Sequence, residues 1–174
     1  MFKAVFIAGI TVFTAVIFAH AGYSKLRNPG DYRDIMATYL NRPIAPWMVL
    51  WVGAVELALG LMVLMPAARV WAALGCGALL LAYALVMWRQ TRLGRRDLRC
   101  GCSGPAAETR VSSELVVRNV VVAVPVLSLA LAAPLQASWA LALMGMAWGL
   151  VLLLLYVATD QIIANRQRMA GWIS

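Results

Sequence analysis

The sequence predicts an all-α membrane protein built as a bundle of five membrane-spanning helices. Of its 174 residues, 63% are hydrophobic and 13% are charged, and the mean hydropathy is +0.81. A soluble domain contains about 45–50% apolar and about 25% charged residues, so this composition excludes a soluble globular domain and a disordered chain. The charged residues gather in short segments between long uncharged runs. Because lipid offers the backbone no hydrogen-bond partners, each uncharged run is expected to form a helix.

The expected spans follow one another along a single domain, residues 1–174. They are placed at about residues 4–21, 46–65, 70–88, 115–133 and 138–159. The last two come from 41 uncharged residues, which as one helix would be about 61 Å long, twice the hydrocarbon core of about 30 Å. We therefore expect this run to fold back at Pro134 and to kink at Pro125. Between the first two spans, the Asn-Pro-Gly-Asp sequence at 28–31 predicts a turn, and residues 31–40 predict a short interfacial helix.

The basic residues predict the orientation of the bundle. Twelve of them lie in three segments that a five-span chain places on one side of the membrane: the loops after the first and third spans, and the C-terminal tail. Lys3 and Arg69 are placed on the other side. Since cytoplasmic loops are enriched in lysine and arginine, the three segments are predicted to be cytoplasmic. The net charge of +8 is thus explained by basic residues that orient the spans in the membrane, and nucleic acid is not expected as a partner.

Two cysteines in the third loop, Cys100 and Cys102, form the most specific motif, Cys-Gly-Cys-Ser-Gly-Pro. A disulfide between cysteines two positions apart closes a small, strained ring, which favours exchange over a structural role. The basic residues near the pair favour the thiolate: they are Arg95, Arg96, Arg99 and Arg118. The alternatives are two free thiols or half of a metal site. With one histidine and no second cysteine pair, no metal is expected within one chain. Cys76, between two glycines in the third span, is expected to pack in the core.

Five further residues are candidates to support this chemistry. Glu56 lies near the middle of the second span, where an ionisable group usually faces the bundle interior. Arg118 and Asn119 open the fourth span and could turn inward to meet it. His20 and Lys25 lie at the end of the first span, on the side of the cysteine loop, and a histidine there could shuttle protons. The alternatives are a protonated carboxyl between helices, a snorkelling arginine and an interfacial histidine.

Three of these segments resemble a known family. Residues 20–26, His-Ala-Gly-Tyr-Ser-Lys-Leu followed by Pro29, resemble the signature of the DoxX-like and MauE-like membrane proteins. The pattern Glu-Leu-x-Leu-Gly-Leu at 56–61 is similar to theirs. The cysteine motif and the Arg118–Asn119 pair narrow the resemblance to the MauE family of methylamine utilisation, over residues 18–133. The chain departs from the family in Arg99 and Ser103, where an acidic residue and a phenylalanine are more frequent.

The resemblance implies a bundle whose four-helix core is similar to the DoxX and vitamin K epoxide reductase type. It also implies a multi-pass protein of the bacterial inner membrane that acts as a thiol–disulfide oxidoreductase through Cys100 and Cys102. Its partners would be a thioredoxin-like protein (MauD-like) and, as client, the small subunit of methylamine dehydrogenase, whose disulfides and cofactor must form. By the same analogy, a quinone is the candidate cofactor. A periplasmic client would place the cysteine loop outside, in conflict with the charge count.

Two other functions remain open from the sequence. One is a membrane scaffold without catalysis, which docks a thioredoxin-like protein through the basic loops. The other is a small transporter that uses Glu56, although no inverted repeat or pair of broken helices is visible in the sequence. Replacing both loop cysteines by serine would abolish the function of an oxidoreductase and spare that of a scaffold.

Overall fold

The computed structural model describes residues 2–95, 98, 110–132 and 138–173. The helices are α1 (Phe2–Arg27), α2 (Pro29–Leu40), α3 (Pro46–Met62), α4 (Arg69–Arg92), α5 (Ser113–Ser128), the 3-10 turn η1 (Leu129–Leu131) and α6 (Trp139–Ile173). No β-strand occurs in the described residues. The predicted all-α class is therefore confirmed for this part of the chain.

Four helices are long and apolar enough to cross a membrane: α1, α4, the segment Ser113–Leu131 and the segment Trp139–Met169. The remaining apolar helix, α3, has 17 residues. The predicted span, residues 46–65, ends three residues later than α3. The helix stops at Met62, four residues before Pro66. A proline disfavours helical backbone at the residue before it. At 1.5 Å per residue, α3 is still about 26 Å long. The chain is thus a multi-pass membrane protein.

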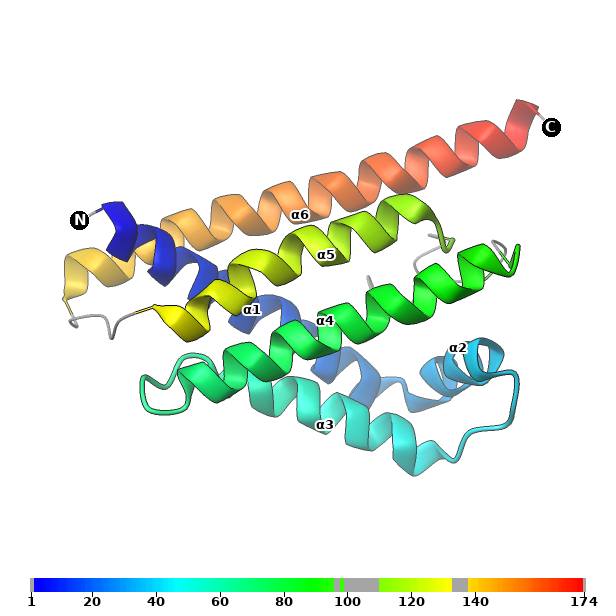
Figure 1. The fold of residues 1–174 in the computed structure, drawn as a ribbon, viewed down its shortest axis with the longest axis horizontal. Helices are drawn as coiled ribbons and strands as arrows, with labels where there is room; N and C mark the ends of the chain where they lie inside the picture. The colour runs from blue at the N-terminus through cyan, green and yellow to red at the C-terminus, as the bar shows by residue number, and fades with distance from the viewer. Residues whose placement is uncertain (1, 96–97, 99–109, 133–137, 174) are drawn as a thin grey trace.

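The ends of the helices gather at two opposite ends of the bundle (Figure 1). One end, which we call the α2 end, holds α2, the start of α3, the end of α4, the start of α5 and the C-terminus. The N-terminus, the α3–α4 turn and the end of α5 lie at the other. At the α2 end, Gln90 Nε2 of α4 donates to Tyr39 O of α2 at 2.8 Å, and Arg166 of α6 forms an ion pair with Glu114 of α5 at 2.8 Å. The three basic segments thus share an end as far as they are described.

Exposed tryptophans mark both ends of the bundle. Trp47, Trp51 and Trp88 are exposed toward the α2 end, at the start of α3 and the end of α4. Trp71 and Trp139 are exposed at the other end, at the starts of α4 and α6. Tryptophan is enriched where a membrane helix meets the headgroup layer. Their placement fits a bundle that lies across the membrane along its long axis.

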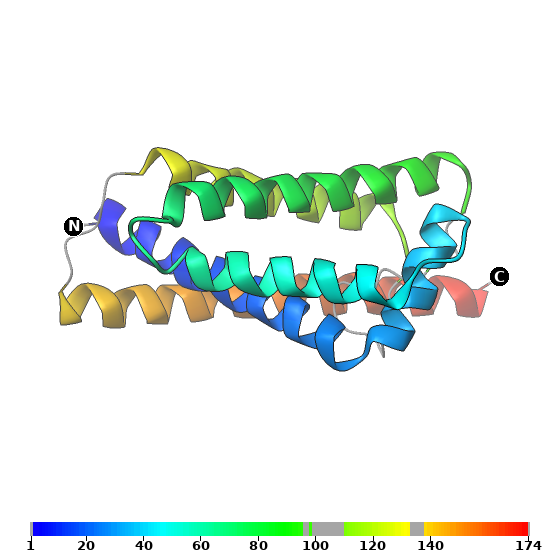
Figure 2. The same cartoon turned by 90° about the horizontal axis from the view of Figure 1, so that it is seen from below.

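Glycines determine how closely α1 packs against its neighbours. A Cβ added to Gly22 would lie 2.6 Å from Gly53 O of α3, so the two backbones touch there. Toward the opposite end, a Cβ on Gly145 of α6 would lie 2.6 Å from Ala8 Cβ of α1. Small residues allow membrane helices such close approach. In Figure 2, α1 crosses α3 and α6 at an angle. The contacts of α1 with α6 run from Ala8 and Gly145 to the rings of Phe13 and Tyr156.

Candidate functional site

A buried carboxylate joins three helices near the α2 end. Glu56 of α3 is 1% exposed. Lys25, on the last turn of α1, donates from Nζ to Glu56 Oε2 at 2.7 Å, and the Tyr83 hydroxyl of α4 donates to Glu56 Oε1. Each carboxylate oxygen therefore has its own donor. A charge buried in a membrane bundle requires such pairing.

Aromatic rings complete the surroundings of the Lys25 ammonium. Its Nζ lies 5.2 Å from the ring centroid of Tyr32 and 5.7 Å from that of Tyr83, within the range of cation–π attraction. Tyr32 belongs to α2, and its hydroxyl lies 3.0 Å from Ser24 Oγ of α1. Pro29 at the first turn of α2 fixes the chain reversal. The interfacial helix thus folds back and covers the ion pair.

A second buried ion pair links α5 and α6. Arg118 Nη1 donates to Asp160 Oδ1, and both side chains are more than nine-tenths buried. Arg118 Nη2 also donates to Asn119 Oδ1 at 3.4 Å, and the guanidinium lies 4.7 Å from the ring centroid of Tyr156. The sequence suggested that Arg118 could meet Glu56, but the structure gives it Asp160. Lys25 and Tyr83 already occupy both oxygens of Glu56.

Asp160 is a site residue that the sequence analysis missed. The last span was predicted to end at residue 159, which left Asp160 as the first polar residue outside the membrane. Helix α6 instead continues to Ile173, and Asp160 faces the bundle in it. One signal was present: Asp160 is the only acidic residue after Glu114, and it follows a long uncharged run.

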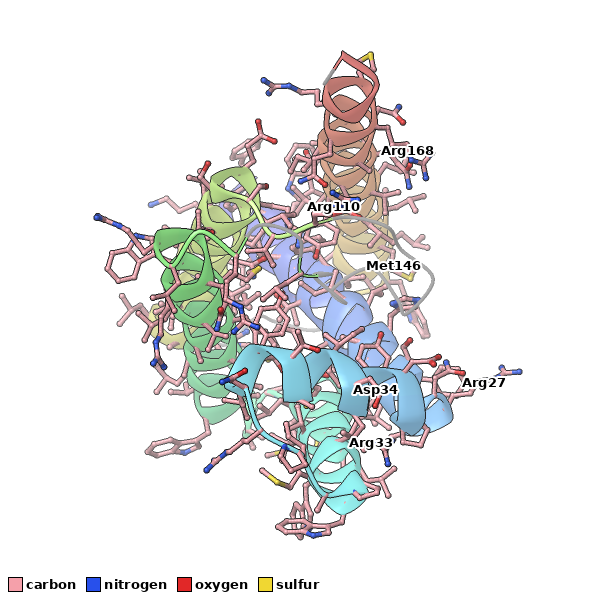
Figure 3. All side chains as sticks on the ribbon, turned by 90° about the vertical axis from the view of Figure 1, so that its right-hand side faces the viewer. Arg27, Arg33, Asp34, Arg110, Met146 and Arg168 are labelled. Atoms are coloured by element: carbon pink, nitrogen blue, oxygen red, sulfur yellow. The ribbon has the colours of Figure 1, made fainter. Side chains whose placement is uncertain are left out.

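The two ion pairs face one cavity of about 590 Å³ at the α2 end. Most of its wall is apolar and comes from α1, α2, α4 and α6. The polar and titratable residues that line it are His20, Lys25, Tyr32, Tyr39, Glu56, Tyr83, Asn119, Tyr156, Asp160 and Gln161. Figure 3 looks onto this end and shows α2 crossing in front of the bundle. The size and the few convergent polar groups are typical of a small-molecule site.

Most of the residues predicted from the sequence meet at this cavity. His20, Lys25, Glu56 and Asn119 line it. Arg118 does not line the cavity, but it donates hydrogen bonds to Asp160 and Asn119, which do. Neither Tyr83 nor Tyr32 was predicted as a site residue. A tyrosine in a helix does not reveal from sequence which side chain its hydroxyl or ring will contact.

Cys100 and Cys102 lie outside the described residues, but the chain on both sides of them is described. Leu98 O accepts a hydrogen bond from Val111 N at 2.8 Å, which joins the two ends of the cysteine segment (residues 99–109). Gln167 of α6 binds Arg110 twice: its Oε1 accepts from Arg110 N at 2.8 Å, and its Nε2 donates to Arg110 O at 2.9 Å. The described residues on both sides of the cysteine segment therefore lie at the α2 end, and Arg110 is held against α6.

The same ends pack close to the cavity. Leu98 and Val111 belong to a buried cluster with Met87, Leu115 and Ile163, and Tyr39 and Tyr83 pack against it. Met87, Tyr39 and Tyr83 also line the cavity. The residues on either side of the cysteine segment thus pack against side chains that also form part of the cavity wall.

The third cysteine has a different environment. Cys76 of α4 is fully buried and packs with Phe18, Leu80 and Val126, as a core residue does. Among the residues that the structure describes, no group of three or more His, Cys, Asp or Glu side chains is arranged to hold a metal ion.

Comparisons with known proteins identify the family. The family model described as methylamine utilisation protein MauE matches residues 3–134, more than half of the chain. The chain belongs to the MauE family. It is 30% identical over 159 residues to the methylamine utilization protein MauE of Methylophilus methylotrophus, which covers 86% of this chain and 82% of that protein. It is 29% identical over 155 residues to the protein of the same name from Paracoccus denitrificans, covering 87% and 83%. No solved structure matches the chain.

Membership of the MauE family confirms the resemblance predicted from the sequence and indicates a role in methylamine utilisation. The MauE match includes both residues of the Lys25–Glu56 pair, together with Tyr83 and Asn119. Asp160 lies beyond residues 3–134. The cavity is therefore built mainly from the part of the chain that defines the family.

Proposed function

We propose that this MauE-family protein is a membrane thiol–disulfide oxidoreductase that works through Cys100 and Cys102. It assists the maturation of the methylamine dehydrogenase small subunit together with a thioredoxin-like partner. The observation that carries the proposal is the placement of Leu98 and Val111, which flank the cysteine segment, beside a cavity that holds a buried Lys25–Glu56 pair. Family membership supplies the link to methylamine utilisation.

The proposed exchange transfers one disulfide from this protein to its partner. A partner thiolate attacks Cys100 Sγ, the Cys100–Cys102 bond breaks, and Cys102 leaves as a thiolate. The second partner thiolate then attacks the partner sulfur of the mixed disulfide and releases Cys100. The partner becomes oxidised, and Cys100 and Cys102 become reduced. Cys100 is proposed as the attacked sulfur because it follows Arg99 in the basic segment. In the reverse exchange, with an oxidised partner, Cys102 is the thiol that resolves the mixed disulfide.

We further propose that α1, α3, α4, Ser113–Leu131 and α6 all cross the bacterial inner membrane, as one domain with the four-helix core of the DoxX type. The α2 end then carries the cysteine segment into the compartment of the client, which is the periplasm. Among the twelve basic residues counted at this end, Lys25 pairs with Glu56 and Arg166 pairs with Glu114. Basic residues that pair with carboxylates of the same chain weaken the case for a cytoplasmic location from charge alone.

The decisive variants replace the loop cysteines in the full-length protein. Cys100→Ser/Cys102→Ser should abolish growth on methylamine in a host whose own copy is deleted, and should leave small-subunit thiols open to alkylation. Cys76→Ser is the matched control, because this thiol is buried in the core beside Phe18, Leu80 and Val126, and it should support normal growth. Normal growth of the double variant at normal protein levels would overturn the proposal.

A scaffold without catalysis is the second candidate, favoured by the charge of the α2 end. Arg27, Arg33, Arg110 and Arg168 all lie at this end (Figure 3). Such a surface would attract an acidic partner and steer its encounter. A scaffold predicts the opposite result: the double serine variant keeps its function, and charge reversal at Arg33 and Arg168 removes it.

A further inference from the structure

A second hollow of the bundle is a groove between α5 and α6. Helix α5 packs mainly on α4, and α6 packs mainly on α1 (Figure 2). The groove that remains between them has a volume of about 710 Å³. Its lining is mostly apolar and comes from three helices, including Phe6 and Ile10 of α1, Val121 and Pro125 of α5, and Leu152 and Leu155 of α6.

The groove is open on its outer side. Val121 and Leu155 line it from opposite helices, and they are 61% and 60% exposed. In a bundle that spans a membrane, apolar side chains exposed along two neighbouring helices face lipid. The groove is therefore accessible to a molecule of the bilayer itself.

The groove has the length of one lipid chain. Along α5 it extends from Ser113 to Pro125, a rise of about 18 Å at 1.5 Å per residue. One leaflet contributes half of the hydrocarbon core of about 30 Å, which is about 15 Å. Because Ser113 lies at the α2 end, the groove extends from the membrane surface at that end to about the mid-plane.

The mouth of the groove at the α2 end is basic. Arg166 lines it, and its Nη1 is paired with Glu114 at 2.8 Å, yet its side chain is still 67% exposed. Arg110 and Arg168 are also exposed and lie at the same end (Figure 3). These three arginines outnumber the Glu114 carboxylate, so the mouth has an excess of positive charge. Long basic side chains near a helix end reach the headgroup layer.

We propose that this groove binds an anionic phospholipid, with one acyl chain between α5 and α6 and the headgroup phosphate on Arg166. The apolar, open wall receives the chain, and the basic mouth receives the phosphate. Basic pockets between membrane helices recognise lipid headgroups in this way. Because the guanidinium has five N–H donors, Arg166 donates to a phosphate while Nη1 stays on Glu114. A bound lipid contacts both helices and stabilises the folded protein.

The test is a lipid titration of the full-length protein in a neutral detergent, followed by thermal unfolding. Dioleoylphosphatidylglycerol is the anionic probe, and dioleoylphosphatidylcholine has the same chains without net charge. The anionic lipid should raise the unfolding midpoint by about 3–6 °C at about ten times its apparent dissociation constant. The neutral lipid should bind about fivefold more weakly, as expected for the loss of one contact between a basic residue and an anionic headgroup.

Two pairs of variants separate the headgroup from the chain. Arg166→Gln should weaken binding of the anionic lipid about fivefold. Glu114→Gln breaks the same ion pair but keeps the cation, and should bind at least as tightly as the parent. Val121→Trp fills the groove and should weaken binding of both lipids at least tenfold. Val120→Trp, at a 42% exposed position of α5 outside the groove, should bind within twofold of the parent. The unfolding midpoints without lipid verify that the variants are folded.

Four results would overturn the proposal. They are equal stabilisation by the two lipids, unchanged binding in Arg166→Gln, equal binding by Val121→Trp and Val120→Trp, and a full shift produced by inorganic phosphate alone. A second copy of the chain is the other occupant that the groove could take. Light scattering that shows a dimer in the parent and a monomer in Val121→Trp would assign the groove to that copy and overturn the lipid site.

Discussion

The Lys25–Glu56 pair should show strong energetic coupling. Glu56→Leu leaves the Lys25 ammonium, 7% exposed, without its carboxylate, and Lys25→Met leaves the carboxylate without its cation. Breaking a buried ion pair from one side costs about 3–5 kcal/mol. Replacing both members by apolar residues of similar volume is often neutral, so Lys25→Met/Glu56→Leu should lie within about 1–2 kcal/mol of the parent. The two single costs together exceed the double cost by at least about 3 kcal/mol.

The assay is a double-mutant cycle on unfolding free energies, measured by SDS titration of the purified protein in mixed micelles. Arg33 and Asp34 provide the matched control, since this pair is 3.4 Å apart with side chains 46% and 75% exposed. Exposed pairs contribute about 0–1 kcal/mol, so Arg33→Ala/Asp34→Ala should show little coupling. A coupling for Lys25 and Glu56 as small as that of the control would refute the buried-pair reasoning. Glu56→Gln should fold and lower activity, because the amide oxygen still accepts the hydrogen bond of Lys25 but the carboxylate charge and its second acceptor are gone.

Three further predictions test other parts of the structure. Asp160→Leu should destabilise the protein by about 3–5 kcal/mol, because it removes the buried carboxylate that forms an ion pair with Arg118; a loss below about 1 kcal/mol in the same SDS titration would contradict this. Gly22→Ala should lower stability by about 2 kcal/mol or more, since the new Cβ would lie 2.6 Å from Gly53 O, whereas Gly30→Ala meets open space and should not. Gln167→Ala should speed hydrogen exchange at the Arg110 amide, whose acceptor it removes; unchanged exchange would show that Gln167 does not hold the cysteine segment.

The sequence predicted the helices well because lipid imposes a simple rule. Uncharged runs must be helices, and four of the five expected spans coincide with helices long enough to cross. The helix ends were predicted less well. Helix α6 runs to Ile173 although the apolar run ends at residue 159. Its last part is held by contacts that the sequence does not reveal, Asp160 with Arg118 and Gln167 with Arg110. Helix α3 stops at Met62 because of Pro66, a signal that was present in the sequence.

Several residues of the site were predicted from the sequence, but which of them pair with one another was not. Glu56 was expected to face the interior, because an ionisable group in mid-span has few other stable positions. Its partner could not be read from spacing, since Lys25 and Glu56 are 31 residues apart and meet only through the contact of α1 with α3 at Gly22 and Gly53. Asp160 was missed because it stands one residue beyond the predicted span.

The measurement that tests the central claim most directly is covalent trapping of the thioredoxin-like partner. The full-length protein with Cys102→Ser is expressed with that partner, free thiols are alkylated, and the membranes are run on a non-reducing gel. The account predicts a complex of the two chains that disappears on adding reductant. Because exchange is reversible, the Cys100 thiolate attacks the disulfide of the oxidised partner, one partner thiolate leaves, and no Cys102 thiol remains to release the adduct. Cys76→Ser should form no such complex. If neither Cys100→Ser nor Cys102→Ser traps the partner while the parent supports growth on methylamine, disulfide exchange through this pair is contradicted.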